Sequence, residues 1–159
     1  MAIPATTIGL KISIAAETTA GTRPTSGYTH LKMVTSFPEL DLSPDTIDTT
    51  SYDNLIYKSS TPGLIDTTGA QAMEAIYSDE ITKTWNDIVT AYESEANAGK
   101  GVWLAVQRLN SEKAWFLPIE PIKTGVPNFP LNDVIKINLQ FTLAGDIIED
   151  TAPTYADEA

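Results

Sequence analysis

Cysteine is absent from this chain of 159 residues, which excludes disulfide bonds, thiolate metal sites and a cysteine nucleophile. Histidine occurs once, at His30, so one subunit cannot supply a histidine-based catalytic triad or a multi-histidine metal site. No apolar run approaches the roughly 18 to 20 residues of a membrane-spanning helix, and the N-terminus lacks a basic segment followed by an apolar one. We therefore expect a soluble protein with no export signal and no membrane insertion.

Positive charge is also scarce: the chain has ten Lys and Arg residues but twenty-one Asp and Glu residues, which gives a net charge of −11. Such a chain can neutralise few phosphates, which disfavours specific binding to DNA or RNA. The same charge suits a surface past which DNA moves without binding, although solubility alone explains an acidic surface equally well. With 42% hydrophobic and 19% charged residues, the composition predicts one globular domain.

Motifs of known catalytic and ligand-binding sites are missing as well. The acidic stretch that begins at Asp41 starts like a calcium loop, but Thr46 stands where that loop needs Gly and Tyr52 where it needs Glu. A solvated run of charge explains this stretch better than a weak calcium site does. The segment 99–101 has neither the spacing of a P-loop nor that of a dinucleotide-binding turn. We predict no catalytic residue, no metal and no cofactor, and therefore no enzyme.

Alternation of apolar and polar residues marks several strands. Ile8 to Ile14 alternate with period two, which predicts a half-buried strand, and a second strand is expected at Leu31 to Ser36 after a loop over residues 18–29. The clearest alternation begins at Val134. One face of that strand carries Ile135, Ile137, Leu139, Phe141 and Leu143, and the other carries Lys136, Asn138, Gln140 and Thr142.

Between these strands the sequence predicts one helix and a hairpin. Gly69 to Tyr77 can form a strand, and a helix follows over Glu80 to Asn97, with Ser78 as its N-cap and Gly99 at its end. Its apolar stripe consists of Ile81, Trp85, Ile88 and Tyr92. The segments Val102 to Leu109 and Lys113 to Leu117 form the hairpin, across which Trp103 and Trp115 could meet.

These elements predict a mostly β fold of the α+β type, a β-sandwich or open barrel with one amphipathic helix packed on its side. We expect one domain over residues 1–145, with a long loop at about 37–69. This loop is either a binding arm or a plain surface excursion, since long loops in compact domains are uncommon unless functional or disordered. Residues 146–159 are acidic and are expected to form a mobile tail.

Four segments, taken in order, resemble a known family. They are the stretch ETTAGTRPTSGYT at residues 17–29, Phe37-Pro38-Glu39-Leu40, Asp48-Thr49-Thr50 and Pro62-Gly63-Leu64-Ile65-Asp66, followed by the helix from Trp85 to Glu93. In this order and spacing the chain, from about Gly9 to about Gly145, resembles the major tail tube proteins of long-tailed (siphovirus-type) bacteriophages of Gram-positive bacteria. The acidic tail and the proline-rich segment from Pro118 to Pro130 have no counterpart in the resemblance.

The resemblance implies a structural virion protein with a β-sandwich subunit. Its hexameric rings would stack into a tail tube that serves as a channel for double-stranded DNA. The implied partners are other copies of the chain, the tape measure and tail terminator proteins, and DNA in transient, non-specific passage. The protein would be made in the host bacterial cytoplasm and reside in the phage tail.

Two groups of residues are candidates for this role. The polar side of the last long strand is expected to face either the lumen or the outer solvent. It carries Lys136, Asn138, Gln140 and Thr142. At contacts between subunits or rings we place Leu55, Ile56, Tyr57, Arg23 and Tyr28. Three other functions stay open: another ring-forming tail component such as a head-tail joining or tail terminator protein, a carbohydrate-binding or adhesion module that uses Trp103, Trp115 and the acidic loop, and a hydrolase with paired carboxylates.

Overall fold

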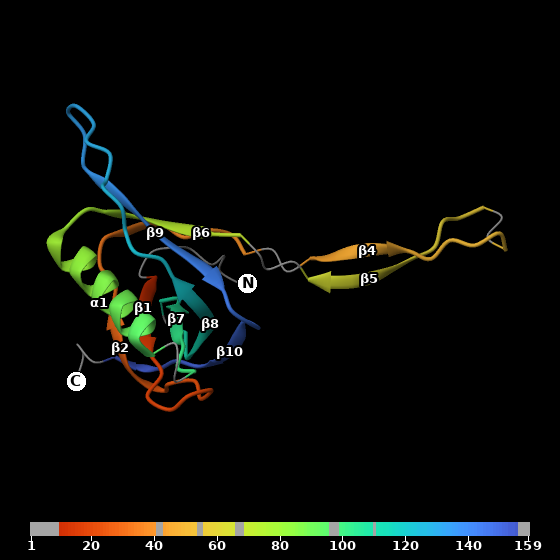
Figure 1. Ribbon diagram of the computed structural model, residues 1–159, viewed down its shortest axis with the longest axis horizontal. Coiled ribbons are helices and arrows are strands. Elements are labelled where there is room, and N and C mark those ends of the chain that lie inside the picture. The colour runs from red at the N-terminus through yellow and green to blue at the C-terminus, as the bar shows by residue number, and fades with distance from the viewer. Residues whose placement is uncertain are drawn as a thin grey trace, which may run out of the picture.

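The computed structural model describes residues 10–40, 43–53, 56–65, 69–95, 99–109 and 111–155. It consists of a curled β-sheet with one helix against it, and two segments extend from this body (Figure 1). The mostly β fold with a single helix is confirmed. Of the two predicted forms, the open barrel describes it, because the strands of the body belong to one continuous sheet.

The sheet of the body has the strand order β11-β2-β1-β7-β8-β9-β6-β3, and β10 pairs with β8 beside β9. All of its pairings are antiparallel except that of β11 with β2. The strands are β1 (Lys11–Ala16), β2 (Ser26–His30), β3 (Val34–Ser36), β6 (Gln71–Ile76), β7 (Val102–Gln107), β8 (Lys113–Pro121), β9 (Lys136–Leu143), β10 (Ile148–Thr151) and β11 (Thr154–Tyr155). A separate two-stranded sheet pairs β4 (Pro44–Asp48) with β5 (Ser60–Ile65).

The helix α1 spans Asp79–Glu95, close to the predicted bounds. Ser78 caps it, because its Oγ accepts a hydrogen bond from the Ile81 N–H at 3.3 Å. Ile81 and Trp85 are buried against the sheet, as the apolar stripe predicts. The predicted end at Asn97 lies outside the described residues, while Gly99 has the left-handed conformation, with φ of 73°, expected of a residue that follows a helix.

Side chains are buried on both faces of β1, β7 and β8. One face meets the helix and holds the main core, which includes Ile14, Trp85 and Leu104. The opposite face holds a smaller cluster of Ala15, Tyr28, Ala105, Ala114, Phe116 and Tyr155. The strand predicted from Ile8 to Ile14 is therefore buried on both faces from Ile12 to Ile14. Ser13, fully buried, donates a hydrogen bond to the Ala105 carbonyl oxygen at 3.5 Å.

The C-terminal segment 146–155 covers the smaller cluster. β10 pairs with one edge of β8, and β11 pairs with β2, so a few residues of chain join two edges of the curled sheet. The Ala152 N–H donates to the Glu112 carbonyl oxygen at 2.9 Å, and the Thr154 N–H donates to the Thr25 carbonyl oxygen at 3.2 Å. The described part of the segment expected to form a mobile tail is thus paired with the sheet and buries Pro153 and Tyr155.

Two further predictions about strands are corrected. β2 lies partly within residues 18–29, which were expected to form a loop, and the strand expected at Leu31 to Ser36 is reduced to β3 because a turn with Met33 at φ of 69° precedes it. The hairpin of β7 and β8 is confirmed, but its register sets Trp103 opposite Pro118 and Trp115 opposite Val106. The two tryptophans therefore do not meet.

Candidate assembly surfaces

The segment predicted as a long loop contains an extended β-hairpin, here called the arm, made of β4, β5 and the residues between them. It extends well away from the body (Figure 1). Beyond the paired strands one backbone bond and one hydroxyl continue the ladder: the Thr49 N–H donates to the Ser59 carbonyl oxygen at 2.9 Å, and the Ser59 N–H donates to the Thr50 Oγ1 at 2.8 Å. The arm is thus held by polar contacts between its own two strands.

Apolar side chains on the arm are exposed. Ile56 and Tyr57 are 83% and 81% exposed, and Ile47, Tyr52 and Leu64 are also open to solvent. A two-stranded hairpin without a packing surface is only marginally stable in water. The arm therefore has the properties of an element that becomes fully stable on a partner surface. Leu55, the other predicted contact residue of this segment, lies outside the described residues.

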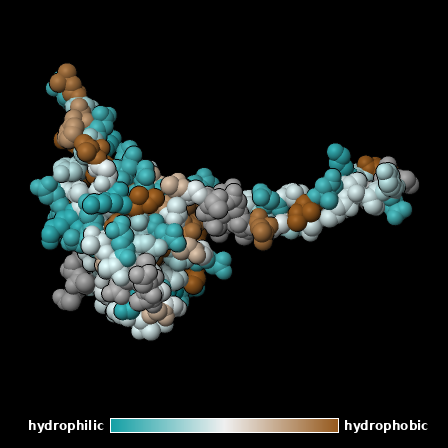
Figure 2. Space-filling model, viewed as in Figure 1, coloured by the Kyte–Doolittle hydropathy of each residue, from teal (hydrophilic) through white to brown (hydrophobic). Residues whose placement is uncertain are grey.

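A second extension, here called the apolar loop, comprises residues 122–135 between β8 and β9 (Figure 1). Its apolar side chains Val126, Phe129 and Leu131 are 87%, 65% and 91% exposed, and brown apolar residues gather at its tip in the space-filling view (Figure 2). Sequence reasoning treated this segment as a proline-rich interruption. The available signal was the presence of these apolar residues directly beside Pro127 and Pro130.

Helix α1 fixes the base of the apolar loop. The Trp85 Nε1–H donates to the Ile122 carbonyl oxygen at 2.8 Å. Asn86 Nδ2 donates to Thr124 Oγ1 at 3.0 Å, and Asn86 Oδ1 accepts from the Thr124 backbone N–H at 3.3 Å. These bonds hold the first residues of the loop against the helix, so the exposed tip is presented from an ordered base.

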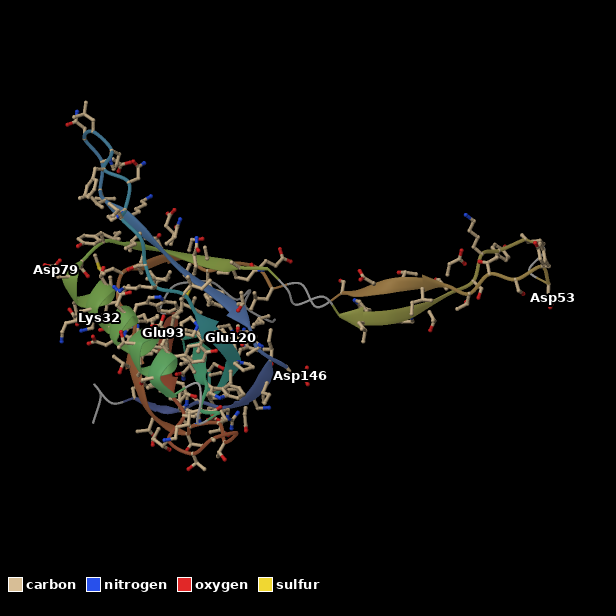
Figure 3. All side chains as sticks on the ribbon, viewed as in Figure 1. Lys32, Asp53, Asp79, Glu93, Glu120 and Asp146 are labelled. Carbon is tan, nitrogen blue, oxygen red and sulfur yellow. The ribbon has the colours of Figure 1, made fainter. Side chains whose placement is uncertain are left out.

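The predicted lumen-facing residues share one face of β9, as their alternation requires. Lys136, Asn138 and Gln140 are exposed, while Thr142 is half-buried and its hydroxyl donates to Glu120 Oε2 at 3.5 Å. Lys136 Nζ lies 3.6 Å from Glu74 Oε1 on the neighbouring strand β6. This face is therefore polar and nearly balanced in charge. The acidic residues labelled in Figure 3 lie mainly elsewhere, as Asp79 and Glu93 on the helix and Asp53 at the end of the arm show.

Arg23 and Tyr28, which were predicted at contacts between subunits, stabilise the subunit itself. Tyr28 is fully buried, its ring lies edge-on to Phe116 with centroids 5.9 Å apart, and its hydroxyl donates to the Pro24 carbonyl oxygen at 2.9 Å. Burial raises the pKa of Tyr28 well above its usual range, so the phenol stays neutral. The Tyr28 side chain is thus enclosed within the subunit, and its predicted role at a contact between subunits stays a prediction.

Arg23 joins the smaller cluster to the C-terminal segment. Its guanidinium lies 4.2 Å from the centroid of the Phe116 ring, and its Nη2 donates to Asp150 Oδ2 at 2.7 Å. The hydrogen bond from Arg23, helped by that from the Thr151 N–H, lowers the pKa of Asp150. Arg23 thus makes contacts within the chain, and its predicted role at a contact between subunits stays a prediction.

This ion pair predicts a pH-dependent contribution to stability. A carboxyl group whose pKa is lower in the folded than in the unfolded chain stabilises the fold above its unfolded pKa of about 4, and this stabilisation is lost as the pH falls through the folded pKa. Thermal unfolding from pH 6 to pH 2.5 should therefore show the wild type losing its advantage over Asp150→Asn at acidic pH. Arg23→Gln, which removes the partner, should behave as Asp150→Asn does. A difference between wild type and Asp150→Asn that stays constant with pH contradicts this account.

Solved structures with the same fold come from phage-tail-like assemblies. A chain of the anti-feeding prophage baseplate, determined by cryo-EM with six-fold symmetrisation, matches with a TM-score of 0.59 and 11% sequence identity over 95% of this chain and 98% of that chain. A chain of the PVC sheath-tube complex of an extracellular contractile injection system, in the extended state, matches with a TM-score of 0.56 and 14% identity over 89% of each chain. No protein family and no curated protein matches the sequence.

At these identities the matches establish a shared fold over almost the full length of both chains. The coarse part of the resemblance, to proteins of phage tails and tail-like particles, agrees with this fold. The specific resemblance to tube proteins of long-tailed phages of Gram-positive bacteria stays a prediction.

Signs of other functions are sparse in the described part of the chain. Its ranges contain no group of three or more His, Asp or Glu side chains placed to hold a metal ion. Among the same residues, no helix has the length and apolar character to cross a membrane. Trp103 is half-buried and donates its Nε1–H to Glu17 Oε1 at 2.7 Å, while Trp115 lies apart from it in the hairpin, so the two do not form one aromatic platform for a sugar.

Proposed function

We propose that this chain is a structural, non-enzymatic subunit of a phage tail or tail-like particle. Copies of it assemble into stacked rings, six subunits to a ring, and the rings form a tail tube through which double-stranded DNA passes. The observation that carries the proposal is the arm, a hairpin whose apolar side chains are exposed beside the rest of the described chain. The fold shared with chains of two injection-system assemblies supports it.

Assembly explains why an exposed arm is retained. An isolated hairpin with exposed Ile, Leu and Tyr side chains is an aggregation hazard in a monomer, because apolar surface and unpaired strand edges attract other chains. In a closed ring or a regular stack the same surface is covered by a defined neighbour. Ile56 and Tyr57 are the contact residues that we retain from the sequence prediction.

The wall of the channel is proposed to be the polar face of β9 and β6. It carries Lys136, Asn138, Gln140 and Thr142, with Glu74 and Glu120 beside them. DNA binding is driven by the release of counterions when Lys and Arg neutralise phosphates. A face with so few cations, one of them 3.6 Å from a carboxylate, would offer DNA little to bind and so would allow it to pass.

Within such a particle the chain would contact other copies of itself and other tail proteins, including a tape measure inside the tube and a terminator at its end. It would be made in the host bacterial cytoplasm and carried in the virion. These partners follow from the resemblance to tube proteins.

A second candidate is a tail component that forms a single ring. The match to a chain of a baseplate over 98% of that chain's length favours it. Both candidate functions use the arm and the same fold. They differ in whether a second ring stacks on the first.

Negative-stain electron microscopy of the concentrated protein separates the two candidates. Tubes of stacked rings support the tube subunit, and isolated rings support the single-ring component. Monomers alone, at concentrations where the wild type remains folded by circular dichroism, contradict both.

A further inference from the structure

The body carries an apolar recess beside the root of the arm. Its lining includes Phe37, Pro38, Leu40, Trp115 and Ile147, and its volume is about 320 Å³. It is formed by the segment that leads into β4, by β8 and by the turn before β10. The described part of the chain does not fill it. Such a recess can receive a small number of apolar side chains.

The apolar loop carries exposed apolar side chains that could enter it. The side chains of Phe129 and Leu131 are largely exposed, and the hydrogen bonds from Trp85 and Asn86 order the base of the loop. In Figure 1 the loop leaves the body at the upper left, whereas β8, which lines the recess, and β10, which follows the lining residue Ile147, lie at the lower right. The loop therefore lies on the other side of the body from the recess of its own chain, and a second copy can bring the two together.

Charge favours this pairing over most other contacts between copies. Each chain carries a net charge of −11, so two copies repel each other on average. The apolar loop, residues 122–135, contains one cation, Lys123 at its base, and one acid, Asp133, and its tip at residues 125–132 carries no charge. Charged residues of both signs adjoin the lining: Glu39 and Asp146 are sequence neighbours of lining residues, Glu149 is paired with Trp115, and Arg108 lies near the Trp115 ring. An uncharged apolar tip can therefore enter an apolar recess without adding to the repulsion between two copies.

We propose that the tip of the apolar loop of one copy inserts into the recess beside the arm root of a second copy. The contact joins two different surfaces, so it repeats head to tail and builds a ring or a stack rather than a symmetric dimer. The proposal rests on the proposed function, in that it names a contact through which copies assemble. It adds a pair of surfaces that the arm does not use.

Cysteine cross-linking tests the contact directly, because the chain has no cysteine of its own. Leu131→Cys at the loop tip and Glu39→Cys at the rim both replace exposed residues. The two variants are purified separately, mixed and treated with a short bis-maleimide, and products are separated by denaturing electrophoresis. We expect a cross-linked dimer in this mixture, at least about tenfold more abundant than in a control mixture of Leu131→Cys with Lys83→Cys, which lies on the exposed side of the helix.

Two outcomes overturn the proposal. One is a dimer no more abundant in the test mixture than in the control mixture. The other is an equally abundant dimer from Leu131→Cys alone, which would mean that loop tips meet each other.

A second variant tests whether assembly depends on the contact. The double substitution Phe129→Ser and Leu131→Ser is expected to raise the concentration needed for assembly at least about tenfold. Leu109→Ser, which changes an exposed apolar residue outside both surfaces, should assemble as the wild type does. If the wild type assembles and the double variant assembles equally well, the proposal fails while the proposed function stands. If the wild type never assembles and no cross-link forms, both fail.

Discussion

Replacing residues 48–59 with an Asn-Gly turn is expected to yield a folded subunit that no longer assembles. Nearly all described residues of this segment are exposed, so the free energy of unfolding should change by less than about 1 kcal/mol. The same replacement removes Tyr52, Ile56 and Tyr57, the exposed apolar side chains through which we propose that the arm binds a neighbour. Thermal unfolding by circular dichroism measures the first effect, and electron microscopy of concentrated protein measures the second.

A matched variant separates the apolar contacts from the length of the arm. Ile56→Ser with Tyr57→Ser keeps the hairpin and the hydrogen bonds of Thr49 and Thr50 to Ser59. It should weaken assembly without changing the stability of the subunit. Tubes or rings of normal appearance from the shortened arm would show that the arm is a plain surface excursion.

Trp85→Ala is expected to have the largest effect on stability of any single substitution in the helix. The side chain is fully buried in the main core, and its Nε1–H donates to the Ile122 carbonyl oxygen. Truncating a buried Trp to Ala costs about 3–5 kcal/mol, and the total stability of a domain is about 5–15 kcal/mol. Urea unfolding followed by far-ultraviolet circular dichroism should show this loss.

Two tryptophan variants serve as controls. Trp85→Phe keeps most of the buried ring but leaves the Ile122 carbonyl oxygen without its donor, so an intermediate loss of about 1–3 kcal/mol is expected. Trp115→Ala changes a side chain that is 37% exposed and should cost less than Trp85→Ala. Equal losses for Trp85→Ala and Trp115→Ala would contradict the packing described for the helix.

Local patterns predicted the elements that local physics determines. Strand β9 follows from the alternation of Lys136, Ile137 and Asn138, which lie on opposite faces of the strand and are exposed, buried and exposed in turn. The helix follows from the cap at Ser78 and the apolar stripe through Trp85. In each case the signal lies within one element, so neighbouring residues suffice to show it.

Contacts between distant residues escaped prediction. The C-terminal segment is held by the pair of Arg23 with Asp150 and by the hydrogen bond from the Tyr155 hydroxyl to Gln107 Oε1, and composition alone made this segment look mobile. Tyr28 was placed at an interface because tyrosine favours interfaces, but the fold encloses it beside Phe116.

Of the candidate surfaces, the sequence indicated the arm through its length and irregularity. It also indicated the polar face of β9 through the alternation. The apolar loop was not predicted. Its prolines indicated only an interruption between strands, and its ordered base depends on a contact between Asn86 and Thr124, which are 38 residues apart in the sequence.

The central claim is that the working form of this protein is an assembly of many copies. Sedimentation velocity of the purified wild type over a series of rising concentrations tests it most directly. The account predicts species many times heavier than the 17.2 kDa chain, with their share increasing with concentration. A single species of 17.2 kDa at every concentration would contradict it.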